Sequence, residues 1–93
     1  MRLTEKEITI ILEAIHTLDC QAQVYLFGSR ADDTLRGGDI DLLIMSTTLT
    51  RDAAGKIRWR IWEQLGEQKI DILIAKDTAD PFVRIALKEG VAL

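Results

Sequence analysis

The sequence predicts a small α/β (α+β) domain in which helices pack mainly on one face of a small mixed β-sheet. Helix-like and strand-like segments alternate along the 93 residues, with no repeat, linker or low-complexity tract between them. This length is enough for one domain and too short for two, and the 47% share of hydrophobic residues allows a compact core. We therefore expect a single domain over residues 1–93, with the element order αβ(α)βαβα.

The first helix is predicted over residues 4–19. Thr4 and Glu7 have the spacing of a capping box, in which each side chain binds a free backbone amide at the helix start. Apolar residues recur at helical spacing and predict one buried stripe. The members of this stripe are Ile8, Ile11, Leu12, Ile15 and Leu18.

Two strands are predicted on either side of a loop. The first covers residues 22–27, a short segment that is rich in strand-forming residues and is ended by Gly28 and Ser29. A short helical turn is expected over about 29–34. The second strand is predicted over 39–45, where the chain is apolar apart from two aspartates.

The second half of the chain continues the alternation. Thr50 is expected to cap a helix over about 51–66, and a third strand is predicted over 69–75. A last helix begins at Pro81, because proline fits the first helical position, and it runs to Glu89. Ile57, Ile61 and Leu65 fall on one face of the helix over about 51–66. Ile70, Ile72 and Ile74 share one side of the strand over 69–75.

Composition argues against several classes of protein. The formal net charge of −3 disfavours broad contact with nucleic acid, so no direct nucleic-acid binding is expected. No run approaches the roughly 20 apolar residues of a membrane span, and the first residues lack the pattern of a signal peptide. The single cysteine, Cys20, is expected to be a small buried hydrophobe. We expect a soluble cytoplasmic protein.

The predicted helix over 51–66 carries one unusual residue, Trp59. It lies roughly opposite Ile57 and Ile61 on a helical wheel, so it is expected to be exposed. Exposed tryptophans are enriched at interfaces, and we hypothesise that Trp59 contacts a partner chain. His16, on the first helix, is expected at the surface or boundary without a role. A solvated basic face is expected from Arg51, Lys56, Arg58 and Arg60.

Three acids on or beside the predicted strands suggest a metal site. Asp39 and Asp41 are two residues apart, so their side chains lie on one face of a strand, and a cation between them would remove their mutual repulsion. Asp71 interrupts the next apolar strand, where a charge is costly to bury unless it is paired or coordinated. Carboxylate oxygens suit Mg²⁺. If the two strands are neighbours, three carboxylates are enough to hold two metal ions.

Residues suited to bind phosphate are expected at the same end of the sheet. Gly28 allows the backbone to approach a ligand closely. Ser29, at the start of a helical turn, would direct its amide and hydroxyl towards a phosphate. Arg30 and Arg36 flank this turn and could bind phosphate oxygens. A nucleoside triphosphate with bound Mg²⁺ needs both kinds of ligand.

Each of these residues also has a purely structural explanation. Asp39 follows two glycines, as turn residues often do, and Asp71 taken alone is more typical of a solvent-facing position on an edge strand. Gly28 alone is typical of a turn, Ser29 of a helix cap and Arg36 of a solvated loop. The combination at this spacing favours the nucleotide site.

The spacing also resembles a known signature. Gly28-Ser29, nine residues, then Asp39-Ile40-Asp41 is similar to the motif of the polymerase-β-like nucleotidyltransferase superfamily, and Asp71 matches its third acid. The short length, the FGSR run and the ending IALKEG resemble the minimal nucleotidyltransferases (MNT) of prokaryotes, including the MntA-type antitoxins of HEPN/MNT toxin–antitoxin pairs. The resemblance covers nearly the whole chain.

The resemblance implies a nucleotidyltransferase fold in which Asp39, Asp41 and Asp71 are the catalytic, Mg²⁺-binding acids. It implies that Gly28 and Ser29 hold the triphosphate. The expected reaction is Mg-dependent transfer of a nucleoside monophosphate, AMP from ATP, to a protein acceptor. The expected partner is a HEPN-domain toxin, to which the chain would be the antitoxin.

Two other functions stay open. A catalytically silent antitoxin would act by covering its partner, but it would not need three acids. An aminoglycoside-type transferase acting on a small molecule usually needs an additional acceptor-binding domain, for which 93 residues leave little room. A homodimer is allowed by an edge strand or an exposed helix face, and nothing in the sequence requires one.

Overall fold

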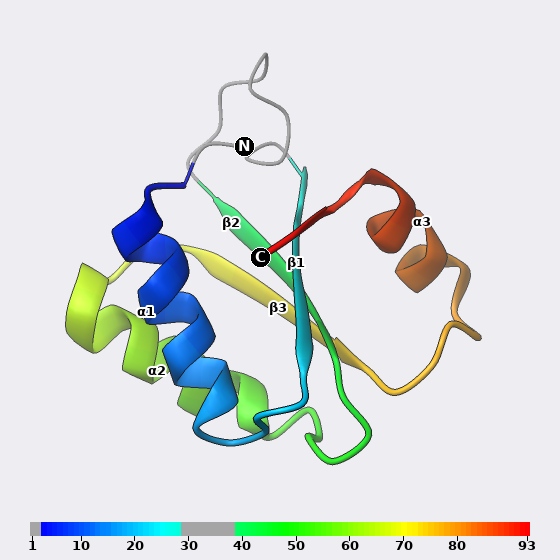
Figure 1. Cartoon of the computed structure of the whole chain (residues 1–93), viewed down its shortest axis with the longest axis horizontal. Coiled ribbons are helices and arrows are strands. Elements are labelled where there is room, and N and C mark those ends of the chain that lie inside the picture. The colour runs from blue at the N-terminus through cyan, green and yellow to red at the C-terminus, as the bar shows by residue number, and fades with distance from the viewer. Residues whose placement is uncertain (1–2, 29–38) are drawn as a thin grey trace.

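A computed structural model describes residues 3–28 and 39–93 and confirms the predicted fold class (Figure 1). The turn predicted over about 29–34 lies outside these residues. The elements are α1 (Glu5–His16), β1 (Gln23–Phe27), β2 (Ile40–Met45), α2 (Ala53–Leu65), β3 (Ile70–Ala75), α3 (Pro81–Glu89) and β4 (Val91–Ala92).

The four strands form one mixed sheet in the order β3-β2-β1-β4. β1 is antiparallel to both β2 and β4, whereas β2 and β3 are parallel and are joined through α2. In this register, Asp41 of β2 lies between Phe27 of β1 and Asp71 of β3. The topology therefore brings together segments that are far apart in the sequence.

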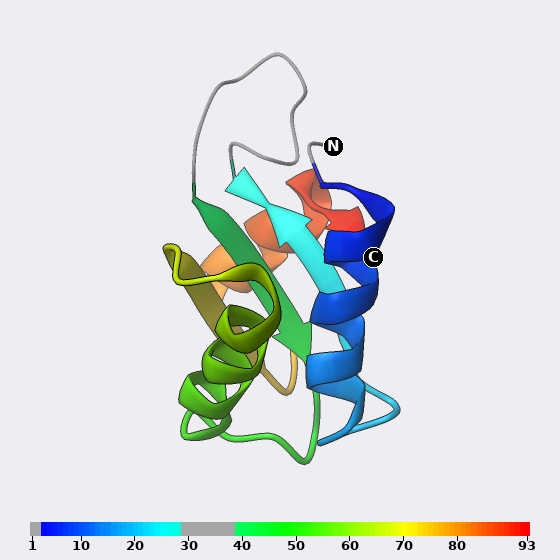
Figure 2. The same ribbon diagram turned by 90° about the vertical axis from the view of Figure 1, so that its left-hand side faces the viewer.

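Helices cover both faces of the sheet, two on one face and one on the other. Figure 2 shows α1 and α2 on the near side of the strands and α3 behind them. Because side chains alternate along a strand, Leu42 faces α1 and α2, and its neighbour Leu43 faces α3. The larger core cluster joins α1 and α2 to the sheet through Ile11, Ile15, Val24, Leu26, Ile40, Leu42, Ile44, Ile57, Ile61 and Ile70.

Local signals account for most helix ends. The capping box of α1 is confirmed: the Glu7 amide donates to Thr4 Oγ1 at 3.1 Å, and the Thr4 amide donates to Glu7 Oε1 at 3.0 Å. Asp80 caps α3 by accepting from the Phe82 amide at 2.8 Å. The predicted Thr50 cap is wrong. α2 begins at Ala53 after Asp52, which makes no side-chain capping bond.

The strand β4 was not predicted, because two residues carry no periodic signal. Gly90 ends α3 with an extended backbone and passes close to β1. A Cβ at Gly90 would lie 2.5 Å from the Ala86 carbonyl oxygen and 3.2 Å from that of Leu26. The small size of this glycine, rather than a left-handed conformation, lets the chain turn back onto β1.

Two side chains expected in the core are exposed. Leu18 is 38% exposed because α1 ends at His16, so Leu18 lies in the turn beyond it. Cys20 is also exposed, in the same turn. His16 is half-buried at the boundary, as expected, with its Nε2 3.0 Å from the Ala22 carbonyl oxygen. Within the described ranges, none of the helices combines the length and hydrophobicity that crossing a bilayer requires.

Candidate functional site

The predicted acids lie where β2 and β3 begin and β1 ends. These two strands are parallel, so both start at the same end of the sheet, and Asp41 and Asp71 are direct neighbours across them. Their side chains share the sheet face that is covered by α3. Asp39 immediately precedes β2. Asp71 is exposed on an edge strand, as its structural explanation required, and it also adjoins Asp41.

The electrostatics of Asp41 are unfavourable for a carboxylate. Burial raises the pKa of Asp41, and the negative charge of Asp71 raises it further, as does a hydrogen bond between the two carboxyls. Asp39 adds to this repulsion, and the positive charge of Lys69 opposes it. Among the described residues, three carboxylates thus share this end of the sheet with the single positive charge of Lys69.

Asp39 is engaged by a lysine that the sequence analysis did not single out. Lys69 Nζ lies 3.4 Å from Asp39 Oδ2, and the Asp39 side chain is 47% exposed. The bond and the charge of Asp39 raise the pKa of Lys69. A register argument could have found Lys69, because Ile40 pairs with Ile70 and the residues before them are neighbours too.

The donor set is consistent with a hard divalent cation, although the acids are not arranged as a finished site. Among residues 3–28 and 39–93, no group of three or more His, Cys, Asp or Glu side chains is arranged to hold a metal ion. Asp41 and Asp71 supply adjacent carboxylates whose repulsion a cation would relieve. Asp39 could join them if it turned away from Lys69.

Gly28 lies directly against the Asp41 carboxylate, a position with no room for a larger side chain. Its φ is +75°, in the left-handed region that favours glycine. A Cβ at this position would collide with the Asp41 carboxylate. The backbone after β1 therefore passes directly over the acid. Of the other predicted phosphate ligands, Ser29, Arg30 and Arg36 lie outside the described residues.

An aromatic pair flanks the acids on the face covered by α3. Phe27, the β1 neighbour of Asp41, packs edge-to-face against Phe82 of α3, with ring centroids 5.9 Å apart. Phe82 remains 52% exposed. The sequence offered no signal for this contact, because it depends on how α3 folds back over the sheet.

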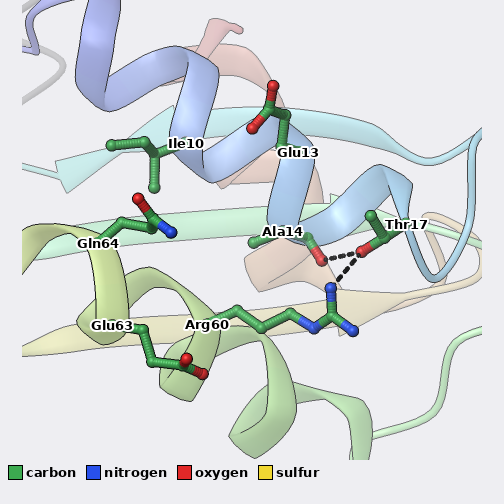
Figure 3. Close-up of a pocket in the computed structure, with 7 residues that line it drawn as sticks. All are labelled: Ile10, Glu13, Ala14, Thr17, Arg60, Glu63 and Gln64. Carbon is green, nitrogen blue, oxygen red and sulfur yellow. Dashed lines mark hydrogen bonds between the residues drawn. The ribbon is translucent and has the colours of Figure 1, made fainter.

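A separate groove of about 450 Å³ lies between α1 and α2 (Figure 3). It is lined by residues such as Glu13, Thr17, Arg60 and Glu63, and by none of the predicted site residues. Arg60 Nη1 donates to Thr17 Oγ1 at 3.1 Å and so links the two helices. This groove has a structural explanation in the packing of α1 against α2.

The basic face of α2 is only partly a solvated face. Arg58 is half-buried, and its Nε donates to the Ile70 carbonyl oxygen at 3.0 Å. The expectation of a solvated residue was therefore wrong for Arg58, whereas Arg60 is exposed even though it bonds to Thr17 just after α1. Trp59 is 62% exposed, which confirms its predicted orientation.

Comparison with known proteins agrees with the geometry. Residues 9–93 match the family described as "Polymerase beta, Nucleotidyltransferase". The fold is similar to a crystal structure of a mutant of the toxin-antitoxin MntA-HpeT, with a TM-score of 0.70 and 19% identity, covering 98% of this chain and 71% of that chain. Comparison with curated proteins finds no match. A match over nearly the whole length, on a sheet that carries the acids at one end, shows that this chain belongs to the polymerase-β nucleotidyltransferase family.

Proposed function

We propose that this chain transfers a nucleoside monophosphate, AMP from ATP, to a hydroxyl of a protein acceptor in a Mg²⁺-dependent reaction. The observation that supports this most strongly is the pairing of Asp41 with Asp71 beside Gly28. Two adjacent carboxylates, one with a raised pKa, sit where the backbone can approach a phosphate. The reaction class follows from the family, and the acceptor and nucleotide are part of the proposal.

Different residues of the chain would bind the metal and the phosphates. Mg²⁺, up to two ions, would be held by Asp41 and Asp71 with Asp39, and would supply charge neutralisation for the triphosphate and the acceptor oxygen. Lys69 holds Asp39 until that carboxylate turns towards the site. Gly28, which already passes close to Asp41, would let the backbone approach the phosphates. Ser29, Arg30 and Arg36 would bind phosphate oxygens.

The bond changes are those of a displacement at phosphorus. The acceptor hydroxyl oxygen forms a bond to the α-phosphorus as the bond to pyrophosphate breaks. Pyrophosphate leaves with the electron pair, and the hydroxyl proton passes to solvent or to a neighbouring carboxylate. In this proposal a partner chain presents the hydroxyl.

We propose that this partner is a HEPN-domain toxin and that the chain is its antitoxin. The similar solved structure is a toxin-antitoxin, which supports such a pairing. The exposed Trp59 on α2 supplies a contact for a partner chain. Trp59→Ala should weaken the complex without lowering stability, and Leu18→Ala, at another exposed apolar position, serves as the control.

The decisive experiment uses labelled ATP, Mg²⁺ and the protein encoded by the neighbouring gene. We expect label on that protein with the wild type, and none with the double change Asp39→Asn plus Asp41→Asn. Asp52→Asn, which removes an acid outside the site, is the matched control and should retain transfer. Transfer that survives the double change would contradict the metal mechanism.

The same experiment separates the two alternatives. A wild type that neither binds Mg-ATP nor transfers label, yet still forms a complex with its neighbour, would be a silent antitoxin. Label appearing on an aminoglycoside instead of the protein would indicate a small-molecule transferase.

A further inference from the structure

The two edges of the sheet are protected to different degrees. On one edge, β4 has only two residues. On the other, β3 pairs with β2 through six consecutive residues, without proline or a bulge, and no other described strand pairs with its far side. A long regular edge strand presents unpaired backbone groups, which makes it a template for another strand.

The direction of the hydrogen bonds identifies the free groups. The carbonyls of Lys69 and Ala75 accept from the amides of Ile40 and Ser46 at 3.2 and 2.9 Å, so odd-numbered residues of β3 point their backbone groups towards β2. Even-numbered residues therefore point theirs outward.

Only part of this outward row is satisfied within the chain. The Ile70 carbonyl accepts from Arg58 Nε at 3.0 Å. For the outward amides and carbonyls of Ile72 and Ile74, the described part of the chain provides no partner. The unsatisfied groups are thus centred on Leu73.

None of the described elements covers this edge. An open groove of about 470 Å³ runs along β3 from Ile72 to Lys76. Ala54 of α2 forms one side of the groove, and Val83 of α3 forms the other. The free backbone groups are therefore accessible from solvent.

We propose that β3 pairs antiparallel with β3 of a second copy of this chain, about a two-fold axis at Leu73. Ile72 then lies opposite Ile74 of the second copy, and Ile74 lies opposite Ile72. Each of these pairs exchanges two backbone hydrogen bonds, so all four free groups of each copy are satisfied. The two four-stranded sheets join into one continuous sheet.

The side chains suit this register as well. Leu73 meets its own copy at the axis, and Ile72 packs on Ile74 of the second copy, so the central contacts are apolar. Lys69, one residue before β3, and Asp77 of the second copy, two residues after its β3, come to the same end of the interface, and the relation occurs twice by symmetry. Asp71 faces the small Ala75. Like charges never oppose each other across this interface, and the symmetric placement favours a second copy over an unrelated segment.

The first test is the oligomeric state of the full chain, measured by sedimentation over a wide concentration range. We expect a reversible dimer for the wild type. Leu73→Lys places two positive charges at the axis and should give a monomer. Ala92→Lys, on the opposite edge strand, is the matched control and should remain dimeric. A wild type that stays monomeric throughout would overturn the proposal.

A charge reversal covers the case in which Leu73→Lys fails to fold, which circular dichroism would reveal. Lys69→Asp or Asp77→Lys alone should weaken dimerisation about tenfold, because two pairs change from attraction to repulsion. The double reversal should restore the wild-type dissociation constant. Single reversals that leave dimerisation unchanged, or a double reversal that fails to restore it, would place the interface elsewhere. None of these measurements depends on nucleotide transfer.

Discussion

An acid lies at each end of β2, and the pKa values of the two acids are shifted in opposite directions. At its start, Asp41 faces Asp71 and Asp39, and burial and these charges raise the pKa of Asp41. At its end, Ser46 Oγ donates to Asp19 Oδ2 at 2.5 Å, and the Gln21 amide donates to Asp19 Oδ1 at 3.0 Å. These bonds lower the pKa of Asp19.

The difference separates an acid that supports the fold from one that we propose serves a function. The buried Ser46 hydroxyl also accepts from the amides of Thr48 and Leu49, so Asp19 belongs to a satisfied network that fixes the chain after β2. Within residues 3–28 and 39–93, Asp41 has no such donors and lies beside two other carboxylates. An uncompensated acid is the one that an external cation can stabilise.

The largest expected effect comes from Asp41→Asn. Nucleotide transfer should fall by about 10³-fold or more, because a proposed ligand of the Mg²⁺ that would neutralise the triphosphate is lost. The free energy of unfolding without metal should stay equal or rise, since a repelled charge is removed. Transfer assays and urea denaturation would measure both. Asp19→Asn should lower the free energy of unfolding and leave nucleotide transfer unchanged. An Asp41→Asn protein that loses stability but keeps transfer would contradict the difference between the two acids.

Ser46→Ala tests the satisfied end of β2. Removing the hydroxyl leaves Asp19 and two backbone amides without their partner, so the free energy of unfolding should fall by about 1–3 kcal/mol. Urea denaturation measures the loss. Thr47→Ala, at the exposed neighbouring position, is the control and should change stability little. Equal stability of the two variants would show that the network is not structural.

Gly28→Ala tests the close approach at the acidic end. The positive φ and the clash with the Asp41 carboxylate should cost about 1–2 kcal/mol of stability, and transfer should also fall. Gly55→Ala is the matched control. A Cβ at Gly55 meets nothing within 4 Å, so this change should stabilise α2 by up to about 1 kcal/mol. A Gly28→Ala protein as stable as the wild type would contradict the steric account.

The smallest effect is the dependence of stability on pH. Because the pKa of Asp41 is raised, the folded protein binds a proton at Asp41 more readily than the unfolded chain does. The stability that this proton contributes is lost as pH rises from 3.8 through the pKa of the folded state. The lowered pKa of Asp19 has the opposite sign, and its contribution is lost as pH falls from 3.8 through the folded pKa.

Melting temperatures of the wild type, Asp41→Asn and Asp19→Asn, measured against pH without divalent ions, would separate the two signs. The stability of Asp41→Asn relative to wild type should increase as pH rises above 3.8. The deficit of Asp19→Asn should shrink as pH falls below 3.8. Mg²⁺ added near neutral pH should raise the melting temperature of the wild type more than that of Asp41→Asn.

The sequence by itself determined the elements and the chemical character of the site. Helical and alternating periodicities located three helices and three strands, because these signals repeat over short stretches. The capping box at Thr4 and the start at Pro81 rest on neighbours in the chain. The neighbouring residues in the sequence also mark Asp41 as unusual, since it is an acid inside an apolar strand.

Tertiary structure decided which of these residues meet. The parallel pairing of β2 with β3 places Asp71 beside Asp41. The same register places Lys69 beside Asp39, with which it forms an ion pair. The two-residue β4, the exposure of Cys20 and the free edge of β3 also depend on contacts between distant segments. Strand pairing is non-local, so no periodicity within one segment encodes its neighbour.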